Sequence, residues 1–116
     1  MAFAVSSCAK DEKAKAREQL KAGVEQANAE IANQNMYGMT VTCSFDGTNV
    51  IYNYLVDENY VSMDDIQANV YMLKSQVEAM PEMKETIDNL KVINGQIIFN
   101  YRGKQSGRIV SEKISF

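Results

Sequence analysis

Two segments in which apolar and polar residues alternate constrain the fold of this chain most strongly. Within residues 39–56, every second residue of each segment is apolar. These residues are Met39, Val41, Cys43 and Phe45 in the first segment and Val50, Tyr52, Tyr54 and Val56 in the second. A period of two places all of them on one face of paired strands. Asp46-Gly47 between the segments suits a tight turn. We therefore expect an antiparallel hairpin whose apolar face lies on the core.

A second strand pair is predicted at the C-terminal end of the chain. Asn94-Gly95 precedes a strand in which Ile97, Phe99 and Tyr101 alternate with Ile98, Asn100 and Arg102. After the loop at residues 102–108, the inward set of the last strand is Val110, Ile114 and Phe116, with Glu112 as a misfit. The loop contains two glycines, but it joins two strands, whereas a phosphate-binding loop leads into a helix. We interpret it as an exposed hairpin tip.

The remaining segments have helical periodicity. Residues 10–36 carry a narrow apolar stripe opposite a charge-balanced face, which is typical of an amphipathic helix. Ser62 and Asp65 resemble a capping box, and apolar residues recur at spacings of three and four as far as Met80. Pro81 is placed to open a second helix, since its missing N–H costs nothing in a first turn. Helix, hairpin, two helices and hairpin together predict an α+β fold, a four-stranded antiparallel sheet with helices on one face.

Composition limits what this domain can do. The 116 residues have room for one domain, and a net charge of −3 argues against nucleic acid as a partner. The chain contains no histidine, and its two cysteines, Cys8 and Cys43, form no CxxC pair. We therefore predict no metal site, no cofactor and no catalytic residues. We interpret Cys43 as a small buried apolar side chain. A disulfide between Cys43 and Cys8 would require that Cys8 be unmodified.

Acidic residues gather at Asp57, Glu58, Asp64 and Asp65. The calcium-binding EF-hand pattern is absent, and no second carboxylate is placed to form a catalytic pair. Carboxylates in the first turn of a helix are stabilised by the helix dipole, so helix capping and a solvated acidic face explain them.

The N-terminal segment contains a predicted lipid attachment site. Val5-Ser6-Ser7-Cys8 resembles a bacterial lipobox, in which the peptide is cut before a cysteine that is then lipidated. The segment lacks the positive region and the long apolar run of a complete signal peptide. Either the natural start lies upstream of Met1, or the segment is a short frayed N-terminus. The resemblance implies a membrane anchor through lipid on Cys8.

Two further resemblances extend the lipobox. Lys10-Asp11-Glu12 is similar to the Lys-acidic-acidic export tag that follows the lipidated cysteine in surface-exported Bacteroidetes lipoproteins. The whole layout resembles the small α+β domains of unknown function in such lipoproteins, and also cystatin-like and β-lactamase-inhibitor-like binding folds. The resemblance implies residues 1–8 as a signal-peptide remnant, 9–17 as a charged stalk and 18–116 as the domain. It places the protein in the bacterial cell envelope, at the outer membrane and exposed on its surface.

The function best supported by the residues is binding. Ile51, Asn53, Leu55 and Ile98 fall on the sheet face opposite the core, where exposed apolar side chains suit a protein partner or another ligand. Two alternatives stay open. One is an enzyme with an unrecognised carboxylate or tyrosine site, and the other is a structural envelope protein.

Overall fold

The computed structural model of the chain describes residues 2–32 and 38–116, with side chains described for 11–31 and 38–116. Four strands, four α-helices and two 3₁₀ turns follow one another in these residues. Their bounds are α1 Ala2–Ala32, β1 Met39–Phe45, β2 Val50–Val56, α2 Met63–Asn69, η1 Val70–Met72, α3 Leu73–Ala79, η2 Pro81–Met83, α4 Lys84–Ile93, β3 Ile97–Gly103 and β4 Ile109–Ile114.

The predicted α+β class is confirmed, and the prediction of an entirely antiparallel sheet is wrong. The strands lie in the order β1-β2-β3-β4. Both hairpins are antiparallel as expected, with Phe45 opposite Val50 in the first. The central strands β2 and β3 are parallel, with Val50 opposite Ile97 and Val56 opposite Gly103. Parallel neighbours need a long crossover, and the helices between β2 and β3 provide it.

The predicted signals at the helix ends are confirmed. Ser62 Oγ accepts a hydrogen bond from the Asp65 N–H at 3.4 Å at the start of α2. Pro81 opens the turn η2 that leads into α4. The apolar spacing runs as far as Met80 in the sequence, but the last buried residue of this stripe is Val77. Met80 is extended and exposed, because the chain turns there into Pro81.

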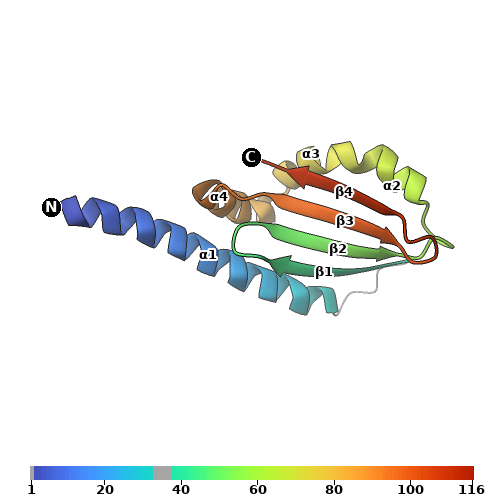
Figure 1. Ribbon diagram of the computed structural model, residues 1–116, viewed down its shortest axis with the longest axis horizontal. Helices are drawn as coiled ribbons and strands as arrows, with labels where there is room; N and C mark the ends of the chain where they lie inside the picture. The colour runs from blue at the N-terminus through green and yellow to red at the C-terminus, as the bar shows by residue number, and fades with distance from the viewer. Residues whose placement is uncertain (1, 33–37) are drawn as a thin grey trace.

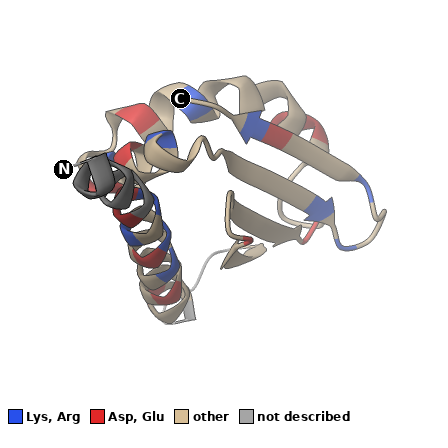
Figure 2. Cartoon of the chain, turned by 60° about the vertical axis from the view of Figure 1, so that its left-hand side comes forward, with Lys and Arg blue, Asp and Glu red and all other residues tan. Residues whose placement is uncertain are grey.

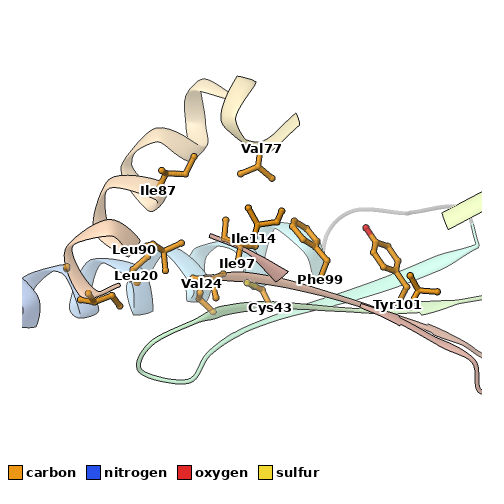
Figure 3. Close-up of a cluster of buried hydrophobic side chains, with 14 of the residues drawn as sticks. Leu20, Val24, Cys43, Val77, Ile87, Leu90, Ile97, Phe99, Tyr101 and Ile114 are labelled. Carbon is orange, nitrogen blue, oxygen red and sulfur yellow. The ribbon is translucent and has the colours of Figure 1, made fainter. Parts of the chain in front are cut away.

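The helices cover one face of the sheet, behind it in the view of Figure 1. Buried side chains of α1, α4 and the inner sheet face form one apolar core, part of which Figure 3 shows: Ala16, Leu20, Val24, Cys43, Val50, Val56, Ile87, Leu90, Ile93, Ile97, Phe99, Tyr101, Val110 and Ile114. Residues 11–15 of α1 are exposed, and Ala16 is its first buried side chain among those described. The N-terminal part of α1 projects past the sheet (Figure 1).

Helix α1 also supplies hydrogen-bond partners to the backbone of β1 at the free edge of the sheet. The Asn28 side chain donates to Cys43 O at 2.6 Å and accepts from Cys43 N at 2.8 Å. A single amide group thus replaces the donor and acceptor of a neighbouring strand. This blunts an edge that would otherwise invite pairing with another chain.

Contacts between turns hold both ends of the parallel strand pair. At the start, Gln96 N donates to Asn49 Oδ1 at 3.0 Å, and Val50 N donates to Gln96 O at 3.0 Å. Asn94 adopts the left-handed conformation with φ 56°, which ends α4 immediately before β3. A Cβ at Gly95 would lie 1.9 Å from Thr48 O, so only glycine fits here.

Glu58 organises the other end of the pair. Its Oε1 accepts from Ser106 N and Ser106 Oγ, each at 2.8 Å, while Lys104 N donates to Val56 O at 2.8 Å. The hydrogen bonds from Ser106, first that of its backbone N–H, lower the pKa of Glu58 below its ordinary value. Arg108 joins the same loop to α2 through an ion pair with Asp64 at 2.6 Å.

Substitution of Gly95 tests the first of these contacts. We expect Gly95→Ala to lower the free energy of unfolding by roughly 1–3 kcal/mol, because the added methyl overlaps a backbone oxygen that cannot rotate away. Gly23→Ala is the matched control. It adds the same methyl where a Cβ meets nothing within 4 Å, so it should raise stability by up to about 1 kcal/mol. Urea unfolding measures both variants, and a neutral Gly95→Ala would contradict the packing of these turns.

The lowered pKa of Glu58 predicts a pH dependence of stability. A carboxylate with a depressed folded pKa contributes stability above its unfolded pKa, and this contribution is lost as the pH falls through the folded value. We therefore expect the wild type to lose more stability than Glu58→Gln between pH 6 and pH 3. Thermal unfolding followed across this range measures the difference. Parallel pH profiles for the two proteins would show that Glu58 contributes nothing to the acid transition.

Candidate functional site

The four residues predicted to form a binding face are brought together on the face of the sheet away from the helices. Ile51, Asn53 and Leu55 come from β2 and Ile98 from β3. The parallel register sets Ile51 beside Ile98, Asn53 beside Asn100 and Leu55 beside Arg102. Side chains of one parity on neighbouring strands therefore form rows that run across the sheet.

The middle row is polar and internally hydrogen-bonded. Asn100 Nδ2 donates to Asn53 Oδ1 at 3.1 Å, and Ser111 Oγ donates to Asn100 Oδ1 at 2.7 Å. Thr42 of β1 lies opposite Asn53 at the start of the row. These bonds hold the amide groups in fixed orientations, so the row presents an ordered pattern of donors and acceptors.

Apolar side chains lie on both sides of the polar row. Ile51 and Ile98 are half-buried, whereas Leu55 is 40% exposed and Ile109 is 64% exposed. Next to Leu55 and Ile109 the surface forms a shallow depression of about 560 Å³, lined by Thr40, Thr42, Asn53, Tyr54, Leu55, Asn100, Arg102 and Ile109. Most of each strand is free of charge, while charged residues of both signs gather on the helices (Figure 2). We call this surface the outer face, and it comprises Ile51, Asn53, Leu55, Ile98, Asn100, Arg102, Ile109 and Ser111.

Sequence reasoning missed Asn100, Arg102, Ser111 and Ile109 as members of this face. Parity alone could have added Asn100 and Arg102, since they alternate with buried residues as Ile98 does. Ile109 was missed because only the inward-facing residues of the last strand were assigned from the sequence, and Ile109 faces outward beside Val110. The bonding between Asn53 and Asn100 depends on the parallel register, which no local pattern reveals.

The groups on the outer face suit noncovalent recognition. They are amides, hydroxyls and aliphatic chains, with Arg102 and Lys113 as the charged side chains of these rows. Apolar anchors beside ordered polar groups are typical of protein contact surfaces. Among the described residues, no group of three or more acidic or cysteine side chains is placed to hold a metal ion.

Cys43 is a buried apolar group, as predicted. It is a free thiol, 5% exposed, on the core side of β1. Burial raises the pKa of the Cys43 thiol to about 11. The thiol therefore stays protonated at neutral pH, which is the state of a structural cysteine rather than a nucleophile.

The inner sheet face carries a row of stacked aromatic rings. Tyr52 stacks on Phe99 with ring centres 5.2 Å apart, and Tyr54 stacks on Tyr101 at 4.5 Å. Tyr101 also lines a pocket of about 270 Å³ beneath the helices, together with Met39, Asp65, Ile66, Asn69, Val70, Leu73 and Gln76. Burial raises the pKa of Tyr101 to about 12, so its hydroxyl remains protonated and can act as a donor.

The proposed lipid attachment stretch lies in the first turns of α1. The backbone of Val5, Ser6, Ser7, Cys8 and Lys10 is helical, and their side chains lie outside those the structure describes. Asp11 and Glu12 are exposed. No helix in the described part of the chain has both the length and the apolar character needed to cross a membrane.

Comparison with known proteins identifies the fold and nothing more specific. No model of a known protein family matches the chain, and no curated protein is significantly similar to it. It is similar to the crystal structure of a candidate secreted protein from Pseudomonas aeruginosa, with a TM-score of 0.57 and 10% identity, over 86% of this chain and 92% of that one. The type II secretion system pilotin AspS from Vibrio cholerae matches with a TM-score of 0.47 and 13% identity, over 88% and 94% of the two chains. At 10% identity the likeness to the Pseudomonas aeruginosa protein is one of α+β fold alone.

Proposed function

We propose that this protein is a lipid-anchored domain of the bacterial cell envelope that binds a partner protein through its outer face. The lipobox-like stretch and the tag at residues 10–12 support the anchor on Cys8 and export to the surface of the outer membrane. The fold likeness to a candidate secreted protein accords with a place outside the cytoplasm. In this proposal the projecting part of α1 holds the domain away from the lipid.

The observation that carries the binding role is the exposure of apolar side chains on the sheet face that the described helices leave uncovered. Leu55 and Ile109 reach solvent on one side of an ordered polar row, and the half-buried Ile51 and Ile98 lie on its other side. A face of this kind loses water favourably when a partner covers it, at about 25 cal/mol for each Å² of apolar surface. The amide groups of Asn53 and Asn100 are held in fixed orientations, so they can form directional hydrogen bonds with that partner.

The alternative function is that of an enzyme with a tyrosine or carboxylate site, and the pocket beneath the helices is where such a site would lie. The pocket contains Tyr101 and Asp65. A tyrosine whose pKa is raised to about 12 is a poor base at neutral pH, but it is a good hydrogen-bond donor. This chemistry favours binding over proton abstraction, so we propose a non-catalytic role. A structural envelope role would share the anchor but require no ligand.

Mass spectrometry of the mature protein from its native host tests the anchor. We expect a polypeptide that begins at Cys8 and carries the added mass of two or three acyl chains. Each acyl CH₂ in a bilayer contributes about 0.8 kcal/mol to anchoring, so more than one chain is needed to hold the domain at the membrane. The Cys8→Ser variant serves as control and should remain unprocessed. An unmodified Cys8 in the wild-type protein would contradict the lipid anchor.

Substitutions on the outer face test the binding role. We expect the triple variant Ile51→Thr, Leu55→Thr, Ile98→Thr to change the free energy of unfolding by less than about 1 kcal/mol, since threonine keeps a strand-compatible shape. The neighbouring Ile97 faces the core and is 0% exposed. Ile97→Ala should therefore cost roughly 2–5 kcal/mol. A triple variant as unstable as Ile97→Ala would show that this face is part of the core.

Photo-crosslinking in the native host supplies the binding readout for the same variants. A crosslinking residue at Ile109 should capture a defined partner, and the triple threonine variant should abolish that product. The same residue at Glu78, which is exposed on α3, serves as the control for random contact. Identical products from both positions would argue against a specific partner on the outer face.

A further inference from the structure

A second surface lies on the opposite side of the molecule, in a groove between α1 and the segment of η2 and α4. The two helices pack together where Leu20 and Leu90 are buried. Beside this contact the surface is hollowed by about 480 Å³, and the lining residues come from α1, β2, η2 and α4: Gln19, Leu20, Ala22, Gly23, Gln26, Ala27, Glu30, Tyr52, Glu82, Met83, Glu85, Thr86 and Asn89. A volume of this size lies within the ~300–1,000 Å³ range of ligand clefts.

The bottom and the α1 wall of this groove allow close approach. Tyr52 and Met83 contribute an aromatic ring and a flexible thioether, which adapt well to apolar side chains of a partner. Ala22, Gly23 and Ala27 form a wall of small residues, and a Cβ at Gly23 would meet nothing within 4 Å. Small residues let a further helix come near the lower end of the usual 8–10 Å axial separation.

The rim of the groove is acidic on both sides. Glu30 stands on the α1 wall, and Glu82 and Glu85 stand on the opposite wall. Among the residues that the structure describes, neither lysine nor arginine lines the groove. Glu30 accepts a hydrogen bond from Gln26 at 3.4 Å, and within the described residues none of the three carboxylates forms an ion pair. These charges therefore remain available to a cation from outside.

We infer that this groove receives an amphipathic helix of a partner protein that carries lysine or arginine on both flanks of its apolar stripe. The apolar stripe would rest on Tyr52 and Met83, and the basic flanks would meet Glu30 on one side and Glu82 and Glu85 on the other. Helices dock into grooves by such stripes at i, i+3, i+4 and i+7. An anionic membrane surface is disfavoured here, because the acidic rim repels it.

A designed peptide pair tests the inference without knowledge of the natural partner. The probe is a 14-residue helix with leucine at its stripe positions and lysine at the flanks, and its match carries glutamate in place of lysine. Titration into the full chain, observed through methionine methyl NMR signals, should shift the Met83 signal saturably with the lysine peptide. The glutamate peptide should bind at least ten times more weakly. Equal affinities would overturn the assignment.

Charge variants locate the binding. Glu82→Lys with Glu85→Lys should weaken the lysine peptide at least tenfold. Glu78→Lys with Asp88→Lys changes the net charge equally at exposed positions that do not line the groove, and it should weaken the peptide by less than threefold. Equal loss in both double variants would mean general attraction to an acidic protein and would overturn the groove as the site.

Filling the groove provides a second, uncharged test. Gly23→Phe places a ring in the open space, so it should abolish the Met83 shift, whereas Gly23→Ala should preserve it. Thermal unfolding confirms that both variants are folded. Peptide binding that survives Gly23→Phe would overturn the proposal. A dimer of this chain, detected by sedimentation and dissociated by Gly23→Phe, would also overturn it, because a second copy would then occupy the groove. The outer-face threonine variant should bind the peptide normally, which separates this inference from the proposed function.

Discussion

The parallel pairing of β2 and β3 is the constraint on which the rest of the structure depends. It joins two local hairpins into one sheet, and contacts between turns hold it at both ends. Gln96 and Asn49 fix the start, where Gly95 passes against Thr48. Glu58 and Ser106 fix the end. Because a shift of one residue would turn every side chain to the other face, these contacts also determine which residues are buried.

Both faces of the sheet derive their pattern from that register. On the inner face it brings Tyr54 over Tyr101 and Tyr52 over Phe99. On the outer face it brings Asn53 beside Asn100, which continues to Ser111. Like residues at matching positions of two parallel strands meet directly, which is why amides pair with amides and rings stack on rings. The core and the proposed binding face are therefore two results of one pairing.

Helix α1 connects the sheet to the proposed anchor and adds surfaces of its own. Asn28 satisfies the edge of β1, and Arg17 Nε donates to Gly47 O at 3.1 Å in the first hairpin. These contacts fix the direction in which the N-terminal turns leave the domain. The same helix supplies the small-residue wall of the acidic groove. Its polar side chains thus attach it to the first hairpin, while its small residues line the groove.

Much of the architecture followed from the sequence because its causes are local. Alternation around Asp46-Gly47 placed β1 and β2, Ser62 and Pro81 marked helix starts, and parity assigned Ile51, Leu55 and Ile98 to the outer face. Cys43 as a buried hydrophobe followed from the same alternation. The direction of β3 against β2 did not follow, because it depends on how the helical crossover packs. Only the tertiary structure decided the amide row, the aromatic stack and the acidic groove, since each joins residues that are distant in the chain and have no local signal for one another.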